Sequence, residues 1–198
     1  MSKSLPITVL GMMSGTSLDG TDLCACRFAE DKGNWQFEIL AAETVPYPSE
    51  WEATLRGAMD LSGHDLAFTH AALGRYFGTL ANEFIRKNGL KIDLIGSHGH
   101  TIFHQPENNL TTQIGDGNAI SAITGIPSVT NFRAMDVVLG GQGAPLVGIG
   151  DSLLFSEYQM CLNIGGFANI SATVNGKQVA YVSEHNIFSE DISSGIIR

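Results

Sequence analysis

The stretch Gly11-Met-Met-Ser-Gly-Thr-Ser-Leu-Asp-Gly-Thr-Asp22 decides the fold of the first part of this chain. One apolar run, at 7–10, leads into it, and a second begins at Leu23. The pattern predicts a strand, a tight glycine turn and a second strand. Gly15 and Gly20 allow backbone conformations with positive φ and a close approach to a ligand. A plain hairpin turn also explains the two glycines, and that interpretation stays open.

The same turn is rich in groups that bind phosphate and magnesium. The hydroxyls of Ser14, Thr16 and Ser17 and the backbone N–H groups can surround phosphate oxygens. Asp19 and Asp22 add carboxylates, which are suitable Mg²⁺ ligands, and Asp19 is the candidate metal ligand. No Gly-Lys-Ser/Thr follows, so this is not a Walker loop. The candidate nucleotide-binding residues are Gly15, Thr16, Ser17, Leu18, Asp19, Gly20, Thr21 and Asp22.

Composition limits the classes of function. The 198 residues carry a formal charge of −9, which argues against a nucleic-acid partner or an anionic membrane surface. Cys24, Cys26 and Cys161 lie in apolar segments and are typical of reduced thiols in a cytoplasmic protein. We find neither a signal peptide nor an apolar run long enough to span a membrane, so we expect a cytoplasmic location.

The periodicity of apolar residues predicts an α/β domain. We expect strands at 7–12, 21–29, 35–45, 92–96 and 127–131. We expect helices at 49–59, 62–88, after Asp116 and at 147–156, with Ser49 and Glu52 forming a capping box. The segments 13–20, 97–104 and 131–143 each begin where a predicted strand ends, which is where open α/β sheets bind ligands.

A second unit is predicted from Tyr158. Residues 160–164, 168–174 and 178–182 repeat the pattern of strand, glycine turn and strand, with Gly165 and Gly166 in the turn. We therefore divide the chain into domains at 1–157 and 158–198. Because no helix-forming half follows, we expect the second sheet to have an uncovered face.

Several motifs in order resemble the anhydro-N-acetylmuramic acid kinase family. Besides the first turn, they are Ser97-His-Gly-His-Thr101, Thr112-Gln-Ile-Gly-Asp116, the stretch from Asn131 to Leu146, and Asn163-Ile-Gly-Gly-Phe-Ala-Asn-Ile-Ser171. The resemblance implies an actin-like ATPase fold, also called ribonuclease H-like, with a mixed sheet and flanking helices, plus an incomplete second domain. It also implies ATP and Mg²⁺ as cofactors and an amino sugar as substrate.

The resemblance assigns residues to each ligand. Gly165 and Gly166 would hold phosphate opposite the first turn. The sugar would contact His98, Thr101, Asp116, Arg133 and Asp136, with Arg133 clamping a lactyl carboxylate or a phosphate. Two alternatives remain: a structural ion pair of Arg133 with Asp116 or Asp136, and a metal site formed by His98, His100 and His104. Family members typically carry Asp where this chain has Asn131.

One departure concerns catalysis. The family has an aspartate in an Asp-x-x-Pro-x-Asn context, acting as general base on the water that opens the anhydro ring. The matching stretch here is Ala180-Tyr-Val-Ser-Glu-His-Asn186, which lacks that aspartate near Val182. Glu184 and Asp191 are not at the motif position, so the catalytic residue is unknown.

We interpret the chain as a truncated family member, and we expect little kinase turnover from it alone. The alternative is a non-catalytic remnant that at most binds sugar or nucleotide. A homodimer is possible for a full-length protein.

Overall fold

The computed structural model describes residues 5–164, 168–174 and 177–182. The chain divides into two compact units, Met1–Gly141 and a second from Gln142 onward. Each unit is described by itself. The division lies 16 residues before the expected one at 157/158, so that the expected helix at 147–156 falls in the second unit.

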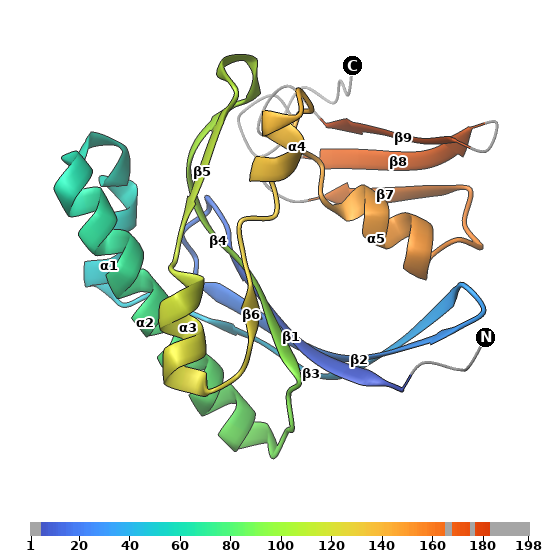
Figure 1. Cartoon of the computed structure of the whole chain (residues 1–198), viewed down its shortest axis with the longest axis horizontal. Coiled ribbons are helices and arrows are strands. Elements are labelled where there is room, and N and C mark those ends of the chain that lie inside the picture. The colour runs from blue at the N-terminus through green and yellow to red at the C-terminus, as the bar shows by residue number, and fades with distance from the viewer. Residues whose placement is uncertain (1–4, 165–167, 175–176, 183–198) are drawn as a thin grey trace, which may run out of the picture. The chain divides into compact units, whose positions relative to one another are not determined.

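The first unit is built on a mixed sheet with strand order β3-β2-β1-β4-β5 (Figure 1). The strands β1 (Ile7–Ser14), β2 (Thr21–Asp31) and β3 (Asn34–Val45) form the predicted antiparallel meander. Strand β4 (Leu94–Gln105) runs parallel to β1. Its other edge pairs with β6 (Ser128–Val129) at Ile95 and Gly96, and with β5 (Leu110–Ile114) from His100 onward.

Helices cover one face of this sheet (Figure 1). The long α2 (Gly63–Asn88) confirms the helix expected at 62–88. It is capped by Ser62, whose hydroxyl accepts from the Asp65 N–H, and it ends at Gly89 in the left-handed region. Its Leu73, Phe77 and Phe84 are buried in the core that also contains Leu10 of β1. The shorter α3 (Gly117–Thr124) lies beside α2, where Asn82 donates to the Ile123 carbonyl.

The structure confirms the expected α/β domain with a mixed sheet and flanking helices, and it corrects some local predictions. Helix α1 (Ser49–Arg56) starts one residue after Pro48, which makes no side-chain cap, so the capping box at Ser49 was wrong. Strand β4 continues nine residues beyond Gly96, because β5 extends the pairing along its edge. Helix α4 (Ala134–Val138) was not predicted, since five residues are too few to show a helical period.

The second unit contains helix α5 (Val147–Leu154) and a three-stranded antiparallel sheet of β7 (Met160–Ile164), β8 (Ala168–Val174) and β9 (Lys177–Val182). Helix α5 packs on one side, where the buried Ser171 hydroxyl donates to Asp151. Met160, Leu162 and Ile164 are 60–64% exposed along the other side of β7, in agreement with the expected uncovered face. Among the described helices, none is both long and apolar enough to cross a membrane.

Candidate functional site

A β-bulge in β4 is the structural centre of the candidate site. Between β1 and β4 the register runs from Met12 opposite Ser97 to Ser14 opposite His100, so β4 carries one extra residue there. Gly99 within the bulge has φ 76°, and a Cβ on it would lie 2.4 Å from the carbonyl oxygen of Ile114. Such bulges redirect side chains, and this one turns His98 out of the regular alternation of the strand.

His98 is held in one tautomer by two neighbours. The Arg133 guanidinium donates from Nε to Nε2 of His98 at 2.9 Å, so the proton of the neutral ring is on Nδ1. Nδ1 donates to the Gly99 carbonyl at 3.0 Å. Burial lowers the pKa of His98, and the adjacent Arg133 charge lowers it further, against the Gly99 hydrogen bond. His98 is therefore a neutral, oriented ring, and Arg133 brings a positive charge beside it.

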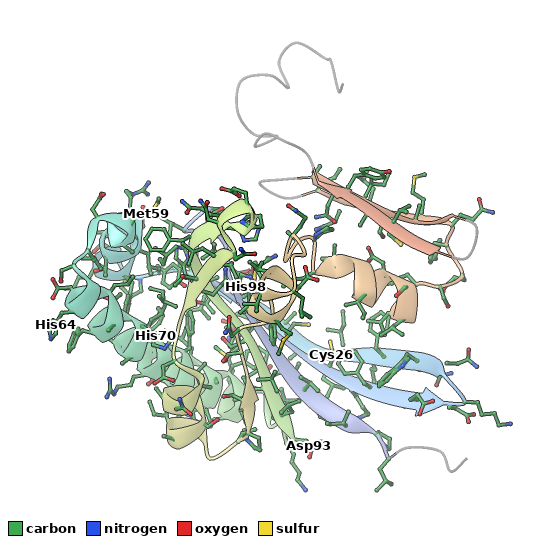
Figure 2. The ribbon with its side chains drawn as sticks, turned by 45° about the horizontal axis from the view of Figure 1, so that its top comes forward. Cys26, Met59, His64, His70, Asp93 and His98 are labelled. Atoms are coloured by element: carbon green, nitrogen blue, oxygen red, sulfur yellow. The ribbon has the colours of Figure 1, made fainter. Side chains whose placement is uncertain are left out.

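A polar pocket of about 410 Å³ opens next to His98. It lies where β5 and β6 separate along the edge of β4, at 97–99, and His70 reaches it from α2 (Figure 2). Hydroxyl and amide groups dominate its wall, a chemistry suited to sugar hydroxyls. The lining residues are His70, His98, Thr111, Thr112, Gln113, Gly115, Asp116, Gly117, Asn118, Ser121, Ser128, Thr130 and Asn131.

The predicted sugar residues stand at different distances from this pocket. His98 and Asp116 line it, and Asp116 also caps α3 by accepting from the Asn118 N–H at 2.8 Å. Thr101 accepts from Nε2 of Gln113, a lining residue, at 3.4 Å. Arg133 reaches the pocket edge through its bond to His98. Asp136 is exposed on α4, with its carboxylate against Gly141, and does not line the pocket.

The β1–β2 turn has a different character. Thr16, Ser17 and Asp19 are exposed, and the Ser17 hydroxyl donates to Asp19 at 2.7 Å. The turn is closed by the Leu18 N–H donating to the Gly15 carbonyl, with Leu18 at φ 59°. These groups therefore present an open, polar loop.

Two residues fix the base of this turn. Gly20 lies so close to the Val45 carbonyl that a Cβ there would be 2.4 Å from its oxygen. The Asp22 carboxylate accepts from the Thr44 hydroxyl on β3 at 2.5 Å. Strand β3 therefore braces the end of the turn where β2 begins.

One hydroxyl expected in the phosphate cradle is used elsewhere. Ser14 is only 2% exposed, and its oxygen bonds to Tyr47 and His100 instead of facing the turn. This could not be predicted from the sequence, because Tyr47 and His100 are far from Ser14 along the chain.

The residues present are compatible with Mg²⁺ and ATP at the turn. Mg²⁺ usually takes one or two carboxylates and completes its shell with water and phosphate oxygens. Asp19, exposed at the turn, is such a carboxylate. Within residues 5–164, 168–174 and 177–182 no group of three or more His, Cys, Asp or Glu side chains could hold a metal. The alternative of a histidine metal site is therefore not supported there, and His100 and His104 bond to Ser14 and Thr111 instead.

Other predicted positions lie outside the described residues: Gly165 and Gly166, and the stretch after Val182 with Glu184 and Asp191. Sequence reasoning also missed pocket residues, notably His70. A signal existed, since His70 falls between Leu66 and Leu73 in the buried stripe of α2, where a polar residue needs a partner. It finds one in the Gly115 N–H, which donates to its Nδ1 at 3.1 Å.

Comparisons with known proteins agree with these motifs. The family model described as anhydro-N-acetylmuramic acid kinase matches residues 7–183. A relative of that name from Pseudoalteromonas translucida is 35% identical over 202 residues, covering 93% of this chain and 49% of its own length. Another from Acaryochloris marina is 42% identical, covering 82% of this chain and 45% of the relative.

The chain thus spans about half the length of the curated relatives it matches. Among solved structures, one titled "Structural Study of the Aquifex aeolicus PPX-GPPA enzyme" aligns over 96% of this chain and 56% of its own, with 9% identity and a TM-score of 0.37.

Proposed function

The chain belongs to the anhydro-N-acetylmuramic acid kinase family. From this we propose that it functions as a sugar kinase acting on 1,6-anhydro-N-acetylmuramic acid. The proposed reaction takes the sugar, ATP and water to N-acetylmuramic acid 6-phosphate and ADP, as a cytoplasmic step of cell-wall recycling. In phosphoryl transfer a protein contributes chiefly position and charge. The first unit offers both, at two places.

The observation that carries the proposal is the bond between Arg133 and His98 beside the polar pocket. A muramic sugar differs from a plain amino sugar by its lactyl carboxylate. A guanidinium at the pocket edge attracts that carboxylate, and a charge-assisted hydrogen bond contributes about 1.5–3 kcal/mol. Neutral His98, Asp116 and the surrounding hydroxyls would hold the sugar hydroxyls. We also assign Thr101 and Asp136 to the sugar side of the site.

We assign the nucleotide to the β1–β2 turn. Residues 15–22 would hold the β- and γ-phosphates, and we also assign Gly165 and Gly166 to phosphate. Asp19 would hold Mg²⁺, which supplies neutralisation of the phosphate charge when bound. The exposed Thr16 hydroxyl is available as a donor to phosphate oxygens, and the Ser17 hydroxyl would donate to one by giving up its bond to Asp19.

Calorimetric titration of the purified chain tests the proposal. Binding is a better readout than turnover, because the chain spans about half the length of its relatives. We expect 1,6-anhydro-N-acetylmuramic acid to bind more tightly than 1,6-anhydro-N-acetylglucosamine, which lacks the lactyl carboxylate. Arg133→Gln should weaken the first sugar by about tenfold to a hundredfold and leave the second nearly unchanged.

The matched control is Arg27→Gln, which removes an arginine in an exposed ion pair with Glu38. It should change neither affinity. Equal affinity of the unsubstituted chain for the two sugars would contradict the role of Arg133 in substrate choice. Failure to bind either sugar would contradict the sugar-kinase proposal for this pocket.

A further inference from the structure

Three polar side chains form a hydrogen-bonded chain inside the first unit, apart from the polar pocket. The Tyr47 hydroxyl donates to the Ser14 hydroxyl at 2.6 Å, and Ser14 lies 2.8 Å from Nδ1 of His100. Ser14 and His100 are only 2% and 4% exposed. Because the Ser14 oxygen accepts from Tyr47, we assign its own proton to the bond with Nδ1, which leaves His100 neutral with its proton on Nε2.

The three hydrogen-bonded side chains lie where the backbone pairing of β1 and β4 is irregular. The register slips between Met12 and Ser14, so that the bulge of β4 interrupts the ladder next to Ser14. Ser14 is also the last residue of β1, and with Thr21 it forms the pair that closes the β1–β2 hairpin. A side-chain bridge therefore joins the end of the 15–20 turn to β4 at the point where backbone pairing is irregular.

Tyr47 is itself held in place. Its ring packs against Tyr76 of α2, with centroids 6.0 Å apart, and Tyr76 in turn packs against Trp51 of α1 at 5.4 Å. Burial raises the pKa of Tyr47, and the charges of Asp19 and Asp22 act in the same direction, whereas its hydrogen bonds act against them. Tyr47 is therefore a protonated donor with a fixed ring.

We propose that Tyr47, Ser14 and His100 form a positioning relay, which anchors the β1–β2 turn to the strand carrying His98 and so sets the turn for nucleotide phosphates. This inference depends on the proposed function in one respect, namely that the β1–β2 turn binds phosphate. Preorganisation of a loop improves affinity because less conformational freedom is lost on binding. The relay also connects β4, which carries His98, directly to the β1–β2 turn.

The test uses substitutions that remove single hydrogen-bonding groups from the full chain. Tyr47→Phe keeps the ring and its packing but removes the donor. Tyr76→Phe is the matched control, since it removes a hydroxyl from the same aromatic cluster without touching the relay. His100→Leu breaks the other end, and His100→Gln should restore it, because an amide oxygen can accept from Ser14.

Two measurements separate the relay from the proposed function. The first is ¹⁵N relaxation of residues 15–20 without any ligand, in variants whose circular dichroism shows a folded chain. Tyr47→Phe and His100→Leu should lower the order parameters of the turn, and Tyr76→Phe and His100→Gln should not. The second is the affinity for Mg²⁺-ATP, which should fall about fivefold to tenfold in the first two variants only.

Each outcome decides something. Unchanged order parameters in Tyr47→Phe would overturn the relay, whatever the nucleotide does. A looser turn in a chain that does not bind Mg²⁺-ATP even without substitution would support the anchoring and contradict the phosphate assignment. A looser turn with unaltered Mg²⁺-ATP affinity would overturn the claim that the relay sets the turn for phosphate.

Discussion

The β1–β2 turn and the polar pocket beside His98 lie in the same unit but are built in opposite ways. In the pocket region, the buried His98 bonds to the partly buried Arg133 and to the backbone of Gly99. In the turn, Thr16, Ser17 and Asp19 are exposed. On the proposed function, the sugar would meet a preformed site, whereas the nucleotide would complete a site that is exposed to solvent without it.

The largest expected effect comes from an alanine at Gly99. The positive φ and the Ile114 carbonyl leave no room for a Cβ, so Gly99→Ala should cost about 3 kcal/mol or more of the free energy of unfolding. Gly15→Ala in the turn meets only the Ser17 hydroxyl at 3.2 Å and should cost less than about 1 kcal/mol. Urea unfolding of both variants measures the contrast. Equal losses would show that the turn is as constrained as the bulge.

Acid should lower the free energy of unfolding through the buried His100. Burial lowers the pKa of His100 from 6.5 to about 4, and His98 adds to the effect. Between these values the unfolded chain binds a proton that the folded chain does not, so stability is lost as pH falls from 6.5 towards 4. The loss from this group is roughly 3 kcal/mol.

Urea unfolding at several pH values measures this dependence. His100→Gln should make this dependence shallower. An unaltered slope in His100→Gln would mean that His100 takes up a proton as readily in the folded chain as in the unfolded chain.

A smaller effect separates two aspartates with different surroundings. Asp116 caps α3, and its replacement by alanine should cost about 1 kcal/mol of stability. Asp19 is exposed in the turn, so Asp19→Ala should change stability by less than about 0.5 kcal/mol. The same unfolding experiment compares them. A larger loss for Asp19 would reveal a structural role that its exposure does not indicate.

The sequence predicted the features that depend on local pattern. The meander from Ile7 to Val45 and the boundaries of α2 follow from alternation, from Ser62 and from Gly89. The bulge at Gly99 was not predictable, because it depends on the close approach of the Ile114 carbonyl. The short helix α4 was also not predicted, since five residues are too few to show a helical period.

The candidate site shows the same division. The sequence motifs identified His98, Asp116 and Arg133 as site residues, but they did not predict how these residues are arranged in space. The strand-end argument for His98 was wrong, because β4 continues to Gln105 and a bulge within the strand redirects the largely buried His98 side chain instead. Ser14 was predicted to face phosphate, yet a tyrosine and a histidine from distant segments bury its hydroxyl. Long-range hydrogen bonds of this kind leave no pattern in a single sequence.

The most direct test of the central claim is a ¹H–¹⁵N NMR titration of the chain with 1,6-anhydro-N-acetylmuramic acid in the absence of nucleotide. If the pocket is preformed, the sugar should shift the amide signals of residues 98–101, 111–118 and 128–133 and leave those of 15–20 unchanged. Shifts confined to the 15–20 turn, or no shifts around His98, would contradict the account.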